Sequence, residues 1–245
     1  MAELKQEHFD TAHLGFLKSV QHSRTDRWDG NDLRTFSKYV EKKARLKNEV
    51  SLPKSLNNGR ASRKDLFQMV QDDTKTTEDC CIAILGWGGI KYHHCVWALE
   101  SRSDWLPIAE DLRFSGLDHK EAYAKFAEQR ENKSLVGVGP AFFTKLIFFL
   151  GVNAETKRRG YIMDQWTARS ANLLLGEKFI KLNSGKYVAD RNDSAIYAKF
   201  CGFIRDLSIE LDTTPDEAEE RIFSIGNKGR LETRGKWRSY VLAKG

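Results

Sequence analysis

The stretch KSLVGVGPAFFTKLIFFLGVNAETKRRGYIMDQWTARSANLL, residues 133–174, decides the fold and most of what can be said about function. A helix over 118–133 leads into it, the glycines of LVGVG (135–139) predict a tight turn, and Pro140 suits the first position of a second helix. Glycine lets the backbone turn sharply and approach another surface. The open N–H groups at the start of the second helix can bind a phosphate, although short helical turns often contain glycine for steric reasons alone.

Lys145 is the one charged residue between Val136 and Ala154, and it lies in AFFTKLIFFL, a helix that is apolar on nearly every side. Such a helix is expected to be buried. A buried ammonium group is costly, so Lys145 must face a cleft, find a partner, or extend its stem to the surface.

Asp164 stands just before QWTARSANLL, where the pattern predicts another helix. As the N-cap of that helix, its carboxylate would accept hydrogen bonds from backbone N–H groups and would be held ionised. N-capping is an ordinary structural role, and for an isolated aspartate it is the favoured interpretation.

The rest of the chain predicts a mainly α fold. Apolar residues recur at helical spacing, as in Phe9, Phe16 and Val20, whereas alternating strand patterns are scarce. Helix starts are expected after Ser62, Thr76 and Thr214, and loops over 51–61, 86–89, 151–160 and 182–193. No linker divides the chain cleanly, and a two-lobed helical body with a cleft between the lobes is an inference from these helices.

Composition excludes several classes of protein. The 245 residues are 40% hydrophobic and 30% charged with only 4 Pro, which argues against disordered and fibrous chains. No apolar run reaches the roughly 18 residues of a membrane span, and the first residues lack the pattern of a secretion signal. We therefore expect a cytoplasmic protein with no membrane partner.

The cysteines do not predict a disulfide framework or a transition-metal site. Cys80, Cys81, Cys95 and Cys201 are few and irregularly placed, and none forms a CxxC pair. Buried, reduced thiols are the expected state, and His93 and His94 beside them do not supply metal-ligand spacing.

Positive charge gathers in two places. The net charge is +6, while residues 226–245 carry Lys228, Arg230, Arg234, Lys236, Arg238 and Lys244 against Glu232 alone. A second cluster is Lys157, Arg158 and Arg159. Such patches are typical of a polyanion-binding protein, but a solvated basic surface explains them equally well.

The segment resembles the helix–hairpin–helix DNA glycosylase superfamily, most closely its 8-oxoguanine glycosylase-like branch. The resemblance lies in the order of its features: a turn, an apolar helix, a loop, Ile-Met-Asp, and a helix that carries Arg169 five residues after Asp164. The resemblance is strong over Leu135–Leu174 and loose over the helical remainder. It implies one two-lobed, mainly α glycosylase-like domain over 1–245 with a cleft between the lobes. It further implies double-stranded DNA as partner, a monomer, and no cofactor.

The resemblance also implies roles for individual residues. Asp164 matches the catalytic carboxylate and Arg169 a basic, DNA-binding position on the next helix. The turn that would seat the DNA backbone is Leu135, Val136, Gly137, Val138 and Gly139. A monovalent cation would be held by the carbonyls of Lys133, Leu135 and Val138. Aromatic candidates for the base pocket or for intercalation are Trp87, Tyr92, His93 and Trp166, each of which could equally be a packing residue.

Two departures from the family pattern bear on the chemistry. Bifunctional relatives carry a nucleophilic lysine two residues after the second glycine of the turn, and that place is Ala141 here. This favours a hydrolytic enzyme that does not nick the strand. Lys145 lies one turn further along the same helical face and could substitute. The loop before Asp164 is also longer than usual, which leaves the register of Lys145 against Asp164 open.

The implied activity is cleavage of the N-glycosidic bond of a base flipped out of the duplex, with the carboxylate of Asp164 stabilising positive charge on the sugar. Oxidised guanine is the substrate that the resemblance favours. Bulky modified bases of phage DNA, such as hydroxymethyl or glucosylated cytosine, are an alternative that would indicate host defence. A non-catalytic DNA-binding module and, less well, an RNA-binding protein are the competing classes.

Overall fold

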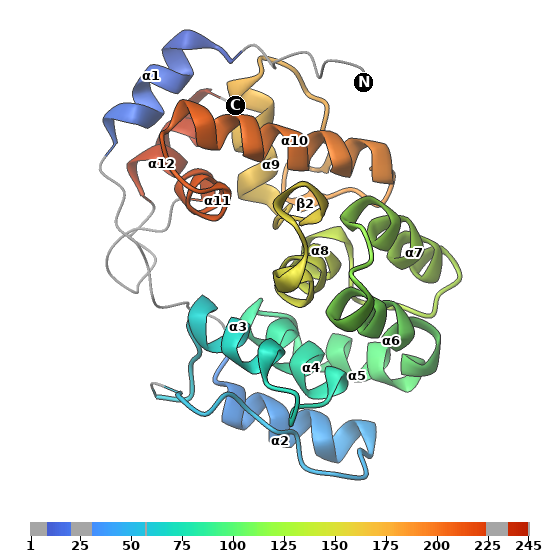
Figure 1. The fold of residues 1–245 in the computed structure, drawn as a ribbon. Coiled ribbons are helices and arrows are strands. Elements are labelled where there is room, and N and C mark those ends of the chain that lie inside the picture. Colours follow the sequence, from blue (N-terminus) through green and yellow to red (C-terminus); the bar gives the residue numbers. More distant parts are fainter. Residues whose placement is uncertain (1–8, 21–30, 57, 224–234, 245) are drawn as a thin grey trace. The chain divides into compact units, whose positions relative to one another are not determined.

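The computed structural model of the chain describes residues 9–20, 31–56, 58–223 and 235–244. The chain divides into two compact units. Unit 2 is the continuous stretch Asp26–Ile162, and unit 1 combines Met1–Thr25 with Met163–Gly245. The mainly helical architecture is confirmed (Figure 1). The expectation of a cleft between two lobes stays a prediction.

Unit 2 is built from helices joined by short connections. Its elements are α2 (Leu33–Ala44), α3 (Arg63–Gln71), α4 (Thr77–Trp87), α5 (Tyr92–Glu100), α6 (Arg102–Glu110), the π-helical turn η1 (Asp111–Ser115), α7 (His119–Glu131), α8 (Pro140–Leu150), and the 3-10 turns η2 (Gly151–Asn153) and η3 (Thr156–Arg158). Three expected helix starts are confirmed in the molecule. Ser62 forms a capping box with Asp65 at α3, Thr76 caps α4, and in unit 1 α11 begins at Pro215.

Helix α8 forms the centre of unit 2. Its residues from Phe143 to Leu150 are all buried, and it packs against α3, α4, α6 and α7 (Figure 1). Aromatic rings fill the layer around it: Phe143 packs edge-on against Tyr123 of α7 at 4.9 Å between ring centroids, and Phe67 of α3 packs against Phe149 at 5.0 Å. A helix that is apolar on every side is stable only in such a place.

A buried arginine joins η1 to the end of α3. Arg113 is 4% exposed, and its guanidinium donates to the carbonyls of Val70, Asp72 and Lys75 at 2.7–2.9 Å. These carbonyls include groups that the end of a helix leaves without intrahelical partners. The charge is therefore buried with its hydrogen bonds made, which fixes the connection between α3 and α4.

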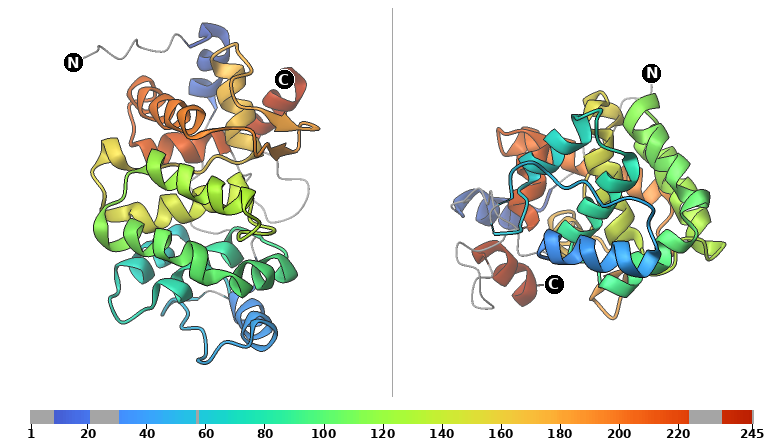
Figure 2. Two further views of the ribbon diagram at one scale, coloured as in Figure 1. Left: turned by 90° about the vertical axis from the view of Figure 1, so that its right-hand side faces the viewer. Right: turned by 90° about the horizontal axis from the view of Figure 1, so that it is seen from below.

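Unit 1 consists of helices and one small β ribbon. Its elements are α1 (Thr11–Ser19), α9 (Gln165–Leu174), β1 (Leu182–Asn183), β2 (Tyr187–Val188), α10 (Ser194–Glu210), α11 (Pro215–Phe223) and α12 (Lys236–Lys244). The strands are antiparallel, with Leu182 opposite Val188 and Asn183 opposite Tyr187. Helix α11 packs against α9, α10 and α12, as the views of Figure 2 also show.

A buried hydrogen-bond chain joins three helices of unit 1. The indole Nε1 of Trp237 on α12 donates to the hydroxyl of Ser170 on α9 at 2.9 Å, and that hydroxyl donates to the carbonyl of Ile222 on α11 at 2.9 Å. Helix α1 joins the same group, since Phe16 stacks on Tyr240 at 4.0 Å between ring centroids. These contacts hold α9, and with it Asp164, in a defined place.

Two details of the sequence prediction were wrong. The expected loop at 86–89 begins later, because α4 continues through Gly86 to Trp87. The expected loop at 182–193 contains the ribbon β1–β2. Strands of two residues are too short to show an alternating pattern of apolar and polar residues, so the sequence did not predict them.

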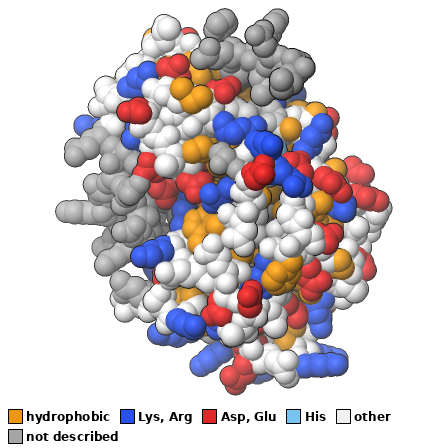
Figure 3. Space-filling model, in the orientation of Figure 1, with side chains coloured by type: hydrophobic (Ala, Val, Ile, Leu, Met, Phe, Trp, Pro, Cys, Tyr) orange, Lys and Arg blue, Asp and Glu red, His pale blue; other side chains and the backbone are white. Residues whose placement is uncertain are grey.

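On the face drawn in Figure 3, Lys and Arg side chains are interspersed with Asp and Glu. Among the described residues, no helix has both the length and the apolar character that crossing a membrane requires.

Candidate active site

The turn between α7 and α8 has the order of helix, turn and helix that the sequence predicts. Leu135 and Val138 are fully buried and anchor the turn in unit 2, whereas the tip residue Val136 is 42% exposed. Gly137 has φ +81°, and a Cβ atom added there would lie 2.7 Å from Cβ of His94 on α5. The turn therefore approaches α5 too closely for any residue but glycine at position 137.

The start of α8 leaves backbone N–H groups open. Gly139 is its N-cap residue without a side-chain cap, and Pro140 occupies the first helical position. The N–H groups of Phe142 and Phe143 both donate to the carbonyl of Gly139, at 2.8 and 3.1 Å. No hydrogen bond within the described residues of unit 2 uses the N–H of Gly139 or Ala141. Two donors at the positive end of the helix dipole are a suitable site for an anion.

The carbonyls proposed to hold a monovalent cation lie on this turn. Lys133 adopts φ +63°. The carbonyl of Leu135 accepts from the N–H of Val138 at 3.4 Å and from Nη1 of Arg130 at 3.5 Å. The guanidinium of Arg130 thus already places positive charge at one of the three oxygens. The cation site stays a prediction.

Lys145 lies in the interior of unit 2, with 5% of its surface exposed. Its Nζ donates to the carbonyl of Ala141 at 2.8 Å and lies 5.0 Å from the ring centroid of Phe142. Its stem runs along Gly88, where an added Cβ would lie 2.7 Å from Cδ of Lys145. Gly88, directly after α4, therefore makes room for this lysine, which reaches back to the position where the family resemblance places a nucleophile.

Asp164 lies at the start of α9 in unit 1 and caps that helix, as the sequence predicts. Its Oδ1 accepts from the N–H groups of Trp166 and Thr167 at 2.8 and 3.1 Å, and its own N–H donates to the hydroxyl of Thr167 at 2.9 Å. The residue is half-buried and follows three buried residues, Tyr161–Met163. Within the described residues of unit 1, no hydrogen bond reaches Oδ2.

Arg169 and Trp166 interact with each other and with their surroundings in unit 1. The Nε of Arg169 donates to the carbonyl of Gly185 in the ribbon turn at 3.0 Å. The ring of Trp166 has the guanidinium of Arg169 5.8 Å from its centroid and that of Arg238 at 4.3 Å. In the amide orientation that satisfies both of its polar atoms, Gln165 accepts from Trp166 Nε1 at 3.1 Å.

The other aromatic candidates have different environments in unit 2. Trp87 is 4% exposed and packs edge-on against Phe149 at 5.0 Å, within the core rather than at a loop tip. Tyr92 is half-buried and packs edge-on against Phe36 of α2 at 5.1 Å. His93 is exposed on α5. Their assignment to a base pocket stays a prediction.

Sequence reasoning missed Trp97, which is 43% exposed one turn after His93 on α5. Its ring centroid lies 4.8 Å from that of His93 and 5.3 Å from that of His94, the residue against which Gly137 packs. An exposed aromatic group thus lies beside the turn. The spacing of four residues from His93 to Trp97 was the available signal.

The structure describes only part of the two positively charged clusters, residues 226–245 and 157–159. Lys228, Arg230 and Arg234 lie outside the described residues. In α12, Arg238 donates to the carbonyl of Phe223 through Nε at 3.2 Å, which ties α12 to the end of α11. In the cluster 157–159, Lys157 forms an ion pair with Glu155 at 3.2 Å, and the guanidinium of Arg159 lies 5.1 Å from the ring centroid of Phe148.

The cysteines are buried as expected, and no disulfide joins them in the described chain. Burial raises the pKa of Cys80 to about 11 and that of Cys95 to about 12. Thiols with such pKa values are poor nucleophiles near neutral pH. The described residues contain no group of three or more His, Cys, Asp or Glu side chains that could hold a metal ion.

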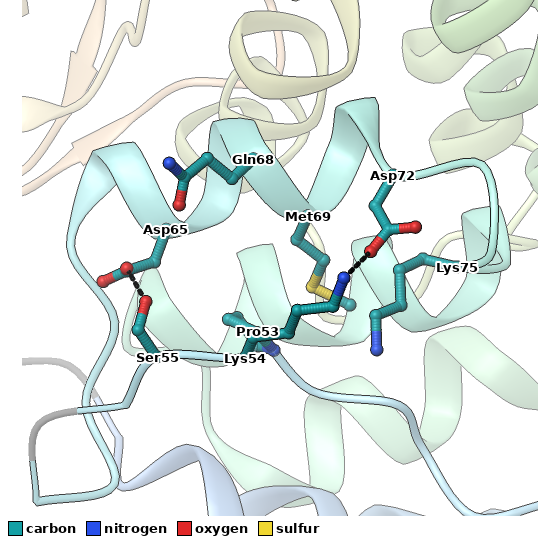
Figure 4. A pocket seen from close by; sticks show the side chains of 8 residues that line it. All are labelled: Pro53, Lys54, Ser55, Asp65, Gln68, Met69, Asp72 and Lys75. Atoms are coloured by element: carbon teal, nitrogen blue, oxygen red, sulfur yellow. Dashed lines mark hydrogen bonds and ion pairs between the residues drawn. The ribbon is translucent and has the colours of Figure 1, made fainter.

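A small cavity of about 210 Å³ lies beside α3, and two pairs of its polar side chains interact with one another (Figure 4). Lys54 forms an ion pair with Asp72 at 3.0 Å, and the hydroxyl of Ser55 donates to Asp65. The hydrogen bond from the Thr74 hydroxyl, followed by that from Lys54, lowers the pKa of Asp72 to about 2. Both carboxylates of this cavity are thus paired, which fits a structural role for this corner.

A comparison with protein families places these observations in context. Residues 30–223 match the model of the family described as "Putative 8-oxoguanine DNA glycosylase OGG-like protein". The chain belongs to this family. The match covers the turn, α8, Asp164 and α9, and it supports the OGG-like branch of the helix–hairpin–helix glycosylases. Comparisons with curated proteins and with solved structures gave no match.

Proposed function

We propose that this OGG-like protein is a DNA N-glycosylase that flips a modified base out of the duplex, cleaves its N-glycosidic bond and leaves an abasic site. The observation that carries the proposal is the family match, because residues 30–223 contain both the turn before α8 and Asp164. Oxidised guanine is the substrate that the family description favours.

The start of α8 supplies the proposed contact with the DNA backbone. The open N–H groups of Gly139 and Ala141 would donate to a phosphate, where the helix dipole adds to their attraction. Val136 projects at the tip of the turn, and Trp97 and His93 offer exposed rings beside it. Aromatic rings of this kind can stack on an unpaired base.

The carboxylate of Asp164 supplies the proposed chemistry. Cleaving the bond between C1′ and the base builds positive charge on the sugar, which an ionised carboxylate stabilises. The capping hydrogen bonds fix Oδ1. The orientation of the group is therefore set before DNA binds, and Oδ2 is the oxygen that would face the sugar.

Water is the proposed nucleophile. It attacks C1′ as the base departs with the electron pair of the broken bond, and the proton that the water loses neutralises the departing base. Ala141 stands where bifunctional relatives place their lysine, and Lys145 is held in the interior by the carbonyl of Ala141 and by Gly88. Attack by Lys145 would instead form a Schiff base and lead to strand cleavage.

The central experiment measures abasic sites after incubation with duplexes containing 8-oxoguanine, uracil, alkylated bases, or hydroxymethyl and glucosylated cytosine. Asp164→Asn should lower the excision rate by a factor of at least about 100, since it removes the charge. Asparagine is also a good N-cap, so folding and DNA affinity should change little.

The matched control is Asp193→Asn. Asp193 caps α10 with the same pattern, accepting from the N–H groups two and three residues further on, both at 2.9 Å. This variant should excise normally. Unimpaired excision by Asp164→Asn would remove Asp164 from the mechanism, and binding without abasic sites on any duplex would support the non-catalytic module.

Borohydride added during turnover separates the two nucleophiles. If water is the nucleophile, no covalent protein–DNA adduct should form. An adduct that disappears in Lys145→Met would replace the hydrolytic route by the lysine route. Methionine fills a similar volume, and thermal melting of the same variant shows whether the fold survives.

A further inference from the structure

Unit 1 contains a large cavity that the proposed reaction does not use. Its volume is about 610 Å³, and α9, the segment after it, the ribbon and α12 contribute to its wall. Five of the residues that line it carry a positive charge: Arg169, Lys178, Lys181, Arg191 and Lys244. A cavity of this size falls within the range of small-ligand sites.

Among the described residues that line this cavity, positive charge is not balanced by negative charge. Glu177 is the one acidic residue of its wall, and that carboxylate pairs with Lys199, which does not line the cavity. Helices α9 and α12 both end here, at Leu174 and Lys244. Their C-terminal partial charges, about half an elementary charge each, together offset about one of the five cations. A strong excess of positive charge remains.

Hydrogen-bond donors remain open in this cavity. Arg169 uses its Nε and Nη2 on the carbonyl of Gly185, and one donor of Lys181 Nζ reaches the carbonyl of Lys178 at 3.2 Å. An ammonium group has three donors and a guanidinium five, so both residues keep others available. Lys178 and Arg191 form no side-chain hydrogen bond or ion pair with the described residues of unit 1.

An apolar surface adjoins these cations. Leu173, Ile180 and Leu182 line the cavity together with the ring of His13. Asn172 holds Ile180 in place, because its side chain bonds both the carbonyl and the N–H of Ile180, at 2.8 and 3.0 Å. A ligand with a flat, weakly polar body and anionic groups would complement such a wall.

The wall of the cavity does not include Asp164. Asp164 stands at the beginning of α9, whereas the wall residues of that helix extend from Arg169 to Leu173. With a rise of about 1.5 Å per residue, they lie about 7.5 to about 13.5 Å from Asp164 along the helix.

We propose that this cavity binds a nucleotide, with its phosphates among Lys178, Lys181 and Arg191 and its base against Leu173 and Leu182. Nucleoside phosphates combine the two chemistries that the wall offers. The nucleotide can be free or can be part of a nucleic-acid strand, and the phosphate chemistry is the same in both cases. Base release by Asp164 does not require this site.

Titration calorimetry with dATP at low salt tests the proposal. The double variant Lys181→Glu/Arg191→Glu should weaken dATP binding at least about tenfold, because it reverses two charges of the wall. The control Lys186→Glu reverses one charge, on an exposed lysine of the ribbon that does not line the cavity. An equal loss in the control, or no binding of dATP to the unaltered protein, would overturn the proposal.

Two further titrations identify the binding chemistry. Inorganic triphosphate should bind several-fold more weakly than dATP, and equal affinity would overturn the role of the apolar wall. Competition by an unmodified duplex assigns the site to a strand, whereas its absence assigns it to a free nucleotide. Because dATP binding is measured without catalysis, failure here leaves the abasic-site assay intact, and thermal melting shows that the double variant is folded.

Discussion

Helix α8 begins after Gly139, which offers no side-chain cap, whereas α9 begins after Asp164, whose carboxylate accepts from two N–H groups of the first turn. The two starts have opposite electrostatic character. The first leaves donors and a positive dipole end open to an anion, and the second carries an anion of its own. The proposed function would use the first start to bind a phosphate and the second to stabilise a cationic sugar.

Helix α10 also begins after an aspartate, Asp193, for which no catalytic role is proposed. The carboxylate of Asp193 accepts from the same two backbone positions as that of Asp164, and the backbone of both residues is extended. The two differ in that Asp164 also forms a capping box with Thr167 and in their surroundings, because Asp193 is exposed while Asp164 is half-buried after three buried residues. Capping geometry alone therefore does not distinguish a reactive carboxylate from a structural one.

The largest expected effect in this comparison concerns the turn before α8. Gly137→Ala must place a residue with a side chain at φ +81° and a Cβ atom 2.7 Å from Cβ of His94. Left-handed backbone and overpacking together should cost about 3 kcal/mol of unfolding free energy in a urea titration. Gly139→Ala is the control, since its nearest neighbour would be 3.8 Å away. Equal stability of both variants would contradict the close approach to α5.

Gly139→Asp would give α8 the same kind of start as α9. The backbone there is extended at φ −84°, so an aspartate can adopt it and cap the helix. We expect DNA affinity to fall about tenfold, equivalent to about 1.4 kcal/mol, because the carboxylate occupies the donors and repels phosphate. Gly139→Ser caps without charge and should weaken binding less. Unchanged affinity in Gly139→Asp, measured by fluorescence anisotropy, would show that phosphate does not bind here.

Replacing either capping aspartate by alanine should have a smaller effect on stability. Asp164→Ala and Asp193→Ala each remove one cap and should each lower the free energy of unfolding by about 1 kcal/mol. Thermal melting of the two variants tests whether the caps are equivalent as structure. A much larger loss for Asp164→Ala would mean that its carboxylate has a further structural role.

The smallest expected effect is the pH dependence of folding stability that His94, beside the turn, contributes. Desolvation, followed by the charges of His93, Lys91 and Arg130, lowers the pKa of His94 below its usual 6.5. The unfolded chain then binds a proton more readily than the folded chain, so stability is lost as the pH falls below 6.5. The loss should stay under about 1 kcal/mol, since the ring is partly exposed. His94→Gln should remove this part of the pH profile, and an unchanged profile would contradict the assignment.

Much of this arrangement could be read from the sequence because it rests on local rules. Ser62 and Asp65 form the capping box that their spacing predicts, Pro140 begins α8, and Asp164 caps α9. Each depends on residues within one helical turn. The burial of α8 also followed from its apolar residues, since such a helix needs protein on every side.

Other features depend on contacts that no local pattern contains. The neighbour of Gly137 is His94, which lies far from it in the sequence, and the space beside Gly88 is taken by the stem of Lys145. Gly86 and Trp87 read as a loop because of their glycine neighbours, yet the apolar face of α4 continues through them. The cationic cavity draws on residues from His13 to Lys244, so only the fold could assemble it.

The division of the chain into two units sets the order in which they can fold during synthesis. Unit 2 is continuous, whereas unit 1 needs both ends, and α9 reaches its final packing only when Trp237 meets Ser170. At roughly 5–20 residues per second, a ribosome needs several seconds to proceed from Asp164 to α12. Under the proposed function, a nascent chain would complete the turn before α8 earlier than the packing that positions Asp164, and a truncated translation product would bind DNA without releasing a base.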